Sequence, residues 1–345
     1  MFQQRKIRTF FLLFLSTILL INCNNSTSSE DECDETNLYA GIEISSTSIK
    51  KTLLERKEDG KLQILNDAKT RQFNFGDNDE IDEGEETQIL DELRKQLEGI
   101  SRHCIKKERV YIAFSSGIIK MKGLDRLKAS IIEKLAFPET NIEGVNYHVE
   151  AISMMMSLDH KLDPSSILFV DIGGSNTKLG IFDKSNNTYL TEELKIGTRS
   201  LEEHVRKMQK GTIVYEDISK IGEELIATEI EDKIVSNVHF TGKQNLILVG
   251  GICYSLADNL YPNRKRDELL TLNFEQEEGN DLLMYQNLLI KETVEIPNQL
   301  KYSIKQLYGG LMIIESLWNI SKAKEVYFQD QISWMPGFIN YKIKQ

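Results

Sequence analysis

From residue 38 onward, apolar and polar positions divide the chain into two successive runs of strand and helix patterns. The first run predicts strands at 38–46, 49–56 and 62–73, a helix at 87–104, a strand at 109–115, a helix at 124–135, a strand at 142–147 and a helix at 149–162. The second run, after Asp163-Pro164, predicts strands at 167–172, 178–182 and 190–196, helices at 201–209 and 221–236, a strand at 245–249, a helix at 303–320 and a strand at 325–329. Residues 262–299 are polar and give no clear pattern.

The two runs begin with the same short motif. Residues 40–50 (AGIEISSTSIK) and 169–178 (FVDIGGSNTK) each place one carboxylate, Glu43 or Asp171, near the end of an apolar strand. A tight turn rich in Ser, Thr or Gly and a second strand follow in both copies. Because each copy opens a half of domain size, the repeat predicts two related α/β domains. We expect residues 38–164 to form an N-terminal lobe and residues 165–345 a C-terminal lobe.

The N-terminal residues have the pattern of a bacterial lipoprotein signal. Three basic residues among the first eight precede an apolar run at 10–21, which is too short for an ordinary membrane-spanning helix. The run ends at Leu20-Ile21-Asn22-Cys23, which resembles a lipobox, where the cysteine is acylated and becomes the mature N-terminus. We expect a signal peptide at 1–23, a lipid on Cys23, a flexible tether at 24–37, and folded lobes outside the cytoplasm on a bacterial membrane, at its periplasmic face or at the cell surface. An uncleaved signal anchor is the alternative.

Charge and cysteine content narrow the function further. The 345-residue chain carries a net charge of −11 and has a pI near 5.2, which argues against a nucleic-acid partner. None of the four cysteines has zinc-ligand spacing. If Cys23 carries lipid, an odd number of thiols remains, so at least one is expected to be free. Apolar neighbours predict that Cys104 and Cys253 are buried.

A strand–turn–strand with an acid near the end of its first strand is a device for binding phosphate. Backbone N–H groups of the turn point at the anion, glycine permits a close approach, and hydroxyl groups add donors. The acid holds a divalent cation or a metal-bound water, because direct contact with phosphate would be repulsive. We therefore expect Glu43 and Asp171 to be metal-binding, across a cleft that clamps a phosphate chain from both sides. The expected phosphate-binding residues in the two turns are Ser46, Ser48, Gly173, Gly174, Ser175, Asn176, Thr177 and Lys178.

These motifs resemble those of the exopolyphosphatase and guanosine pentaphosphate phosphohydrolase family. Residues 170–177 (VDIGGSNT) are similar to the family's second phosphate loop, and residues 41–48 stand where its first loop is expected. Glu150-Ala151 resembles the family's catalytic Glu and the small residue after it, and 248–251 (LVGG) resembles a Gly-rich strand end near the substrate. The likeness extends over residues 38–339. It implies an α/β protein of two ribonuclease H-like domains, of the actin, hexokinase and sugar kinase superfamily, flanking an interdomain cleft.

The resemblance also implies roles for individual residues. Glu150 would be the general base that activates water for attack on a terminal phosphoryl group. Asp171 would sit beside Mg²⁺ or Mn²⁺, with Glu43 opposite. Backbone amides of the second turn would stabilise charge on the transferring group, and Gly250 and Gly251 would bind phosphate at the strand end.

Three features depart from the family pattern. The first loop has Glu43 and Ser45 where the family has Asp and Gly, and His148-Val149 replace an acidic pair. The second loop ends in Lys178 where the family has Glu. A lysine at this position removes a metal ligand, although its ammonium could neutralise a phosphate directly.

The leading hypothesis is an extracytoplasmic, metal-dependent phosphoanhydride hydrolase of the exopolyphosphatase type, which releases terminal phosphate from polyphosphate or a nucleotide. The compartment favours polyphosphate, because ATP and guanosine alarmones are cytoplasmic. A catalytically degenerate lipoprotein that binds a phosphate chain or nucleotide is one alternative. An apyrase-like ecto-nucleotidase is another. The sequence also allows a homodimer.

Overall fold

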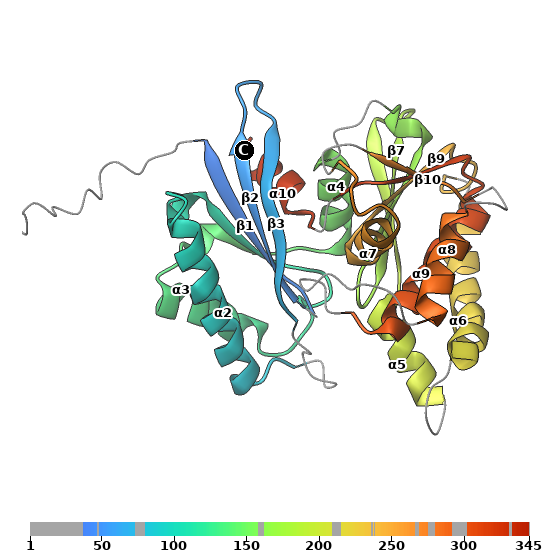
Figure 1. Ribbon diagram of the computed structural model, residues 1–345. Coiled ribbons are helices and arrows are strands. Elements are labelled where there is room, and N and C mark those ends of the chain that lie inside the picture. The colour runs from blue at the N-terminus through green and yellow to red at the C-terminus, as the bar shows by residue number, and fades with distance from the viewer. Residues whose placement is uncertain are drawn as a thin grey trace, which may run out of the picture.

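The computed structural model describes residues 37–46, 48–72, 80–157, 162–208, 215–235, 237, 239–265, 269–274, 280–291, 302–330 and 333–344. Two β-sheets with flanking helices form two lobes, and two further helices lie between them (Figure 1). The signal peptide, the lipid-bearing Cys23 and nearly all of the tether expected from the sequence lie outside the described residues. Within the described part of the chain, no helix is both long enough and apolar enough to cross a membrane.

The first sheet has the strand order β3-β2-β1-β4-β5. β1 pairs with β2, and β2 with β3, in antiparallel fashion, whereas β4 is parallel to both β1 and β5. Apolar residues of β1 and β4 pack against one face each of α2 and α3. The α2 helix begins with a capping box, in which Asp82 accepts from the Glu85 amide at 2.8 Å and Glu85 accepts from the Asp82 amide at 3.0 Å. The bounds are β1 Leu38–Ile44, β2 Ser48–Arg56, β3 Leu62–Gln72, α2 Glu83–Ser101, β4 Val110–Phe114, α3 Leu124–Leu135 and β5 Ile142–Gly144.

The second sheet repeats this arrangement. Its order is β10-β11-β9-β6-β7-β8. The run β8-β7-β6-β9-β11 has the same strand order and the same strand directions as β3-β2-β1-β4-β5 in the first sheet. The additional strand β10 is antiparallel to β11 at the edge. The bounds are β6 Ile167–Ile172, β7 Thr177–Asp183, β8 Thr188–Leu194, α5 Thr198–Met208, α6 Tyr215–Ile230, β9 Asn245–Val249, α7 Gly251–Leu260, β10 Leu270–Leu272, α8 Asp281–Ile290, α9 Ile304–Ser321 and β11 Glu325–Phe328.

Two features refine the elements expected from the sequence. The stretch at 262–299, which had no clear pattern, contributes β10 and α8 to the second lobe. Short 3₁₀ segments at Lys107–Arg109, Glu139–Asn141 and Pro164–Ser166 immediately precede β4, β5 and β6. A π-helical turn at Glu231–Val235 continues α6.

Helices α4 (Tyr147–Ser157) and α10 (Met335–Lys342) connect the two lobes (Figure 1). α4 follows β5 of the first sheet but packs on β7 and β8 of the second, and α10 returns from the C-terminus to pack on α4 and β1. Gly337 makes this contact possible, because a Cβ atom there would lie 1.6 Å from the Ser153 carbonyl oxygen. A third apolar cluster, separate from those under each sheet, surrounds Trp334 and Phe338. The C-terminal helix α10 is therefore part of the contact between the two lobes.

The two cysteines in the described lobes have different states. Cys253 is a buried free thiol, as the sequence predicts. Cys104, which follows α2, is half-buried and disulfide-bonded, and its partner falls outside the described residues. The expectation of a simply buried Cys104 was wrong, because apolar neighbours in sequence do not reveal a covalent partner from a distant segment.

Candidate functional site

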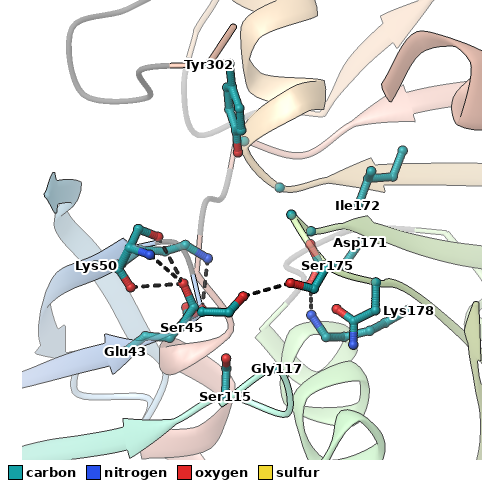
Figure 2. A pocket seen from close by; sticks show the side chains of 17 residues that line it. Glu43, Ser45, Lys50, Ser115, Gly117, Asp171, Ile172, Ser175, Lys178 and Tyr302 are labelled. Atoms are coloured by element: carbon teal, nitrogen blue, oxygen red, sulfur yellow. Dashed lines mark hydrogen bonds and ion pairs between the residues drawn. The ribbon is translucent and has the colours of Figure 1, made fainter. Parts of the chain in front are cut away.

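The two hairpin turns of the repeated motif meet at one pocket between the lobes (Figure 2). Part of this pocket is open to solvent. Ser46 of the first turn and Ser175 of the second share a hydrogen bond of 2.8 Å between their hydroxyl groups, so the turns touch directly. Strand ends and helix starts complete the lining, which consists of Glu43, Ser45, Ser46, Ser48, Lys50, Ser115, Gly117, Asp171, Ile172, Gly173, Gly174, Ser175, Asn176, Lys178, Gly250, Gly251 and Tyr302.

Both turns are closed by the same backbone hydrogen bond. The Ser45 amide donates to the Ser48 carbonyl at 2.8 Å, and the Gly173 amide donates to the Asn176 carbonyl at 2.9 Å. The sequence repeat is therefore a repeat of local geometry. The φ angle of Ser45 is not positive, so a residue with a side chain fits this position of the turn without backbone strain. Its hydroxyl also accepts from the Ser48 amide at 3.1 Å, which further fixes the first turn.

The second turn is held from behind by the start of α5. The Thr198 amide donates to the Gly173 carbonyl at 3.0 Å, and the Arg199 amide donates to the Gly174 carbonyl at 2.8 Å. None of the described residues accepts a hydrogen bond from the amides of Gly174 and Ser175. A turn anchored through its carbonyls, with amide donors left over, has the chemistry of an anion-binding site.

The Gly250-Gly251 pair brings the N-terminus of α7 to the same pocket. Gly250 has φ of +91°, and a Cβ atom there would lie 2.7 Å from Asp171 Oδ1. Only glycine fits this position, for both backbone and steric reasons. Because the N-terminus of a helix carries partial positive charge, α7 adds a further favourable contribution for an anion.

In the first lobe, Glu43 is held by two side chains. Its Oε1 accepts from Lys50 Nζ at 2.9 Å, and its Oε2 accepts from the Ser333 hydroxyl at 2.8 Å. Glu43 is only 2% exposed. Burial lowers the pKa of Lys50, but the negative charges of Glu43 and Asp171 outweigh this effect and raise that pKa overall. Lys50 is therefore an ammonium ion at neutral pH.

In the second lobe, Lys178 lies between two carboxylates. Its Nζ is 2.8 Å from Glu150 Oε2 and 3.2 Å from Asp171 Oδ2. All three side chains are buried, with exposed fractions of 6% for Lys178, 7% for Asp171 and 0% for Glu150. Burial lowers the pKa of Lys178, yet Asp171 and Glu150 raise it more, so the net pKa is far above its usual value.

Glu150 stands behind Lys178, outside the lining of the pocket. Its Oε1 accepts a hydrogen bond from the Ser116 amide. Burial raises the pKa of Glu150, and the neighbouring Lys178 ammonium opposes that rise without cancelling it. The carboxylate that the family resemblance identifies as the general base is thus fixed in place and shielded by an ammonium.

The two acid–lysine pairs are structurally equivalent. Glu43 lies directly across the hairpin from Lys50, and Asp171 lies directly across from Lys178. The sequence separation is seven residues in both lobes. Figure 2 shows one pair on each side of the pocket. No role was assigned to Lys50 from the sequence. The signal that could have identified it is that Lys50 occupies the same position in the first copy of the repeat as Lys178 does in the second.

Most of the residues expected to contact phosphate or metal line the pocket, but Thr177 does not. Its hydroxyl donates to the Ile196 carbonyl at 2.8 Å, and the residue is fully buried. Alternation along β7 explains the difference, because consecutive side chains point to opposite faces and Lys178 takes the pocket side. Sequence reasoning also missed Ser115, Tyr302 and Ser333; the last two come from segments far along the chain that no local motif connects to the turns.

The residues present do not fit the divalent cation that the family resemblance implies. Mg²⁺ requires oxygen ligands at about 2.0–2.1 Å in octahedral geometry. Glu43 and Asp171 each have a lysine ammonium within hydrogen-bonding distance instead. Within the described ranges, His, Cys, Asp and Glu side chains form no group of three that could hold a metal.

Comparisons with known proteins agree with the fold. No protein-family model matches the chain, and no curated protein matches its sequence. Among solved structures, a Ppx/GppA family member from Aquifex aeolicus has 17% identity and a TM-score of 0.68, with 89% of this chain and 97% of that chain covered. An exopolyphosphatase from Cytophaga hutchinsonii has 15% identity and a TM-score of 0.70, with 89% and 98% covered. A third structure, described as an exopolyphosphatase-like protein, has 14% identity and a TM-score of 0.68, with 88% and 97% covered. The chain therefore has the two-domain α/β fold of the Ppx/GppA exopolyphosphatase structures over most of its length, which confirms at the level of the fold the resemblance found in the sequence.

Proposed function

We propose that the chain binds the terminal phosphates of a phosphate chain, either inorganic polyphosphate or a nucleotide, in the pocket between the lobes. One observation carries this proposal: two turns of the same geometry meet at the pocket and contact each other through Ser46 and Ser175. Each turn supplies amide and hydroxyl donors, and each lobe adds an ammonium from Lys50 or Lys178. Donors converging from both sides suit a ligand with several phosphate oxygens.

Phosphoanhydride hydrolysis of the exopolyphosphatase type is a second candidate, favoured by the raised pKa of Glu150. A base is most effective when its pKa lies near the working pH, and burial moves the pKa of Glu150 in that direction. However, Glu150 is fully buried and pairs with Lys178. Turnover would require the bound phosphate to draw the Lys178 ammonium toward itself and leave Glu150 free to accept a proton from water.

The location supports inorganic polyphosphate as the ligand. We propose that Cys23 carries the lipid anchor and that the lobes lie outside the cytoplasm, since the first 23 residues have the pattern of a lipoprotein signal. The disulfide at Cys104 is typical of an oxidising compartment. Nucleotides are scarce there, so an apyrase-like role has less support.

Isothermal titration calorimetry tests the proposal directly. The full chain, purified in detergent, is titrated with tripolyphosphate, ATP, ADP and inorganic phosphate, with and without Mg²⁺ or Mn²⁺. We expect tripolyphosphate to bind, and Lys50→Met to weaken binding about 10- to 100-fold, since a buried hydrogen bond to a charged group contributes about 1.5–3 kcal/mol. Lys184→Met removes an exposed lysine outside the pocket and serves as the matched control. If none of these ligands binds under any metal condition, the proposed function is wrong.

A further inference from the structure

Each lobe places a lysine directly opposite its hairpin carboxylate on the neighbouring strand. Two residues directly opposite each other in an antiparallel pair have Cβ atoms about 4.5–5.5 Å apart, close enough for a long side chain to reach across. Lys50 reaches Glu43 in this way at 2.9 Å, and Lys178 reaches Asp171 at 3.2 Å. A lysine–carboxylate ion pair across the hairpin therefore occurs once in each half of the repeat.

The Lys178 ammonium occupies the space between two buried carboxylates. It lies within 3.2 Å of Asp171 and 2.8 Å of Glu150, where a bridging divalent cation would also have to sit. The ammonium is also beside the second turn, because a Cβ atom on Gly173 would lie 3.8 Å from Lys178 Nζ. A metal ion and this ammonium cannot occupy the same volume, and their charges repel each other.

Lys178 and Lys50 can also donate hydrogen bonds to a ligand in the pocket. An ammonium group has three N–H donors. Lys178 donates a hydrogen bond to Asp171 Oδ2 at 3.2 Å, and its charge forms an ion pair with Glu150 Oε2 at 2.8 Å. A donor remains for a phosphate oxygen in the pocket that Lys178 lines. Lys50 makes one hydrogen bond to Glu43 and lines the same pocket from the opposite lobe.

We infer that Lys178, together with Lys50, takes the place of a divalent cation, so that the pocket binds phosphate without metal. This inference rests on the proposed function, because it concerns how the same pocket neutralises its ligand. Asp171 and Glu150 hold the Lys178 ammonium in position, as they would hold a metal ion. The pocket is thereby specific for the metal-free form of a phosphate chain.

Two measurements on the full chain in detergent test the inference. In the first, tripolyphosphate is titrated by calorimetry in metal-free buffer with EDTA and again in excess Mg²⁺. We expect binding to be at least as tight in EDTA, because Mg²⁺ sequesters the ligand. Lys178→Met should weaken the EDTA binding about 10- to 100-fold. Binding that requires Mg²⁺ would overturn the inference and leave the proposed function intact, whereas no binding in either buffer would overturn the proposed function itself.

The second measurement needs no phosphate ligand. Free Mn²⁺ is followed by electron paramagnetic resonance as it is titrated into wild type, Lys178→Glu and Lys184→Glu. Both variants make the same charge change, but Lys184 is exposed on the turn after β7. We expect Lys178→Glu to gain one bound Mn²⁺ per chain that wild type and Lys184→Glu lack. A pocket-specific Mn²⁺ in wild type, lost on Asp171→Asn, would contradict the inference. If Lys178→Glu does not fold, the wild-type titrations still decide.

Discussion

Replacing Lys178 with Met should destabilise the second lobe strongly. The substitution keeps the length and apolar stem of the side chain but removes the charge that lies between Glu150 and Asp171. These carboxylates are 0% and 7% exposed, so water solvates them poorly when the ammonium is removed. Breaking a buried ion pair by removing one partner costs about 3–5 kcal/mol, because the remaining charge is uncompensated. We expect a loss of this size in the free energy of unfolding at pH 8.

The pH dependence of this loss identifies its cause. Burial already raises the pKa of Glu150, and the variant lacks the ammonium that opposes the rise. The folded variant should then bind more protons than its unfolded chain, so its stability should increase as the pH falls from 8 to 5. Wild type gains the full contribution of Lys178 below the unfolded lysine pKa of about 10.4, as long as the partner carboxylates are ionised. As the pH rises, this contribution should be lost only at strongly alkaline pH, because the folded pKa of Lys178 is raised.

Urea unfolding of wild type and variants at pH 8 and pH 5, monitored by circular dichroism, measures these effects. Adding Glu150→Gln to the Lys178→Met variant should recover part of the lost stability at pH 8, because one of the two uncompensated charges is then absent. Lys184→Met, at a lysine whose side chain is 74% exposed, should change stability by no more than about 0.5 kcal/mol. A Lys178→Met variant as stable as wild type at pH 8 would refute the view that the ammonium is the buried counter-ion.

Three further changes have defined outcomes. Gly250→Ala should destabilise the protein by about 1–3 kcal/mol and abolish tripolyphosphate binding, because φ is +91° and the new Cβ would press on Asp171. Unfolding curves measure the loss of stability and calorimetry measures the loss of binding. Unchanged affinity would show that Gly250 is not part of the binding site. If the chain hydrolyses tripolyphosphate, Glu150→Gln should slow phosphate release about 10²- to 10⁴-fold with affinity little changed, and robust release by this variant would exclude Glu150 as the base. Cys23→Ala should leave the precursor uncleaved or release the protein from membranes, as measured by fractionation; equal acylation in variant and wild type would rule out the lipid anchor.

The repeat explains why so much of the fold followed from the sequence. An acid near the end of an apolar strand, followed by a hydroxyl- or glycine-rich turn, is local information. Both turns duly form the same closing hydrogen bond, at Ser45–Ser48 and at Gly173–Asn176. Because the two copies lie at the start of equivalent sheets, their tips meet at one pocket. Local patterns were therefore sufficient to predict most of the residues that line it.

Contacts between distant segments could not be predicted in this way. Helix α10 packs on α4 because Gly337 admits the Ser153 carbonyl, and apolar spacing alone does not indicate which surface a helix covers. Ser333 reaches Glu43 from a segment 290 residues later in the chain. The Thr177 hydroxyl turns inward to Ile196 because of the phase of β7 relative to the turn, which depends on the exact start of the strand.

The equivalent lysines Lys50 and Lys178 help to decide whether the pocket still binds an anion or has lost that function. If substitutions had only removed a bound metal ion, Glu43, Asp171 and Glu150 would remain as buried acids without a counter-ion, which is strongly destabilising. Replacement of those acids by apolar residues would be the simplest remedy if only stability mattered. In this chain each hairpin acid instead lies opposite a lysine on the neighbouring strand, and both lysines line the pocket beside the two turns. Two ammonium groups lie where a phosphate would bind. This positive charge favours a pocket that binds an anion over a pocket whose lysines only stabilise the fold.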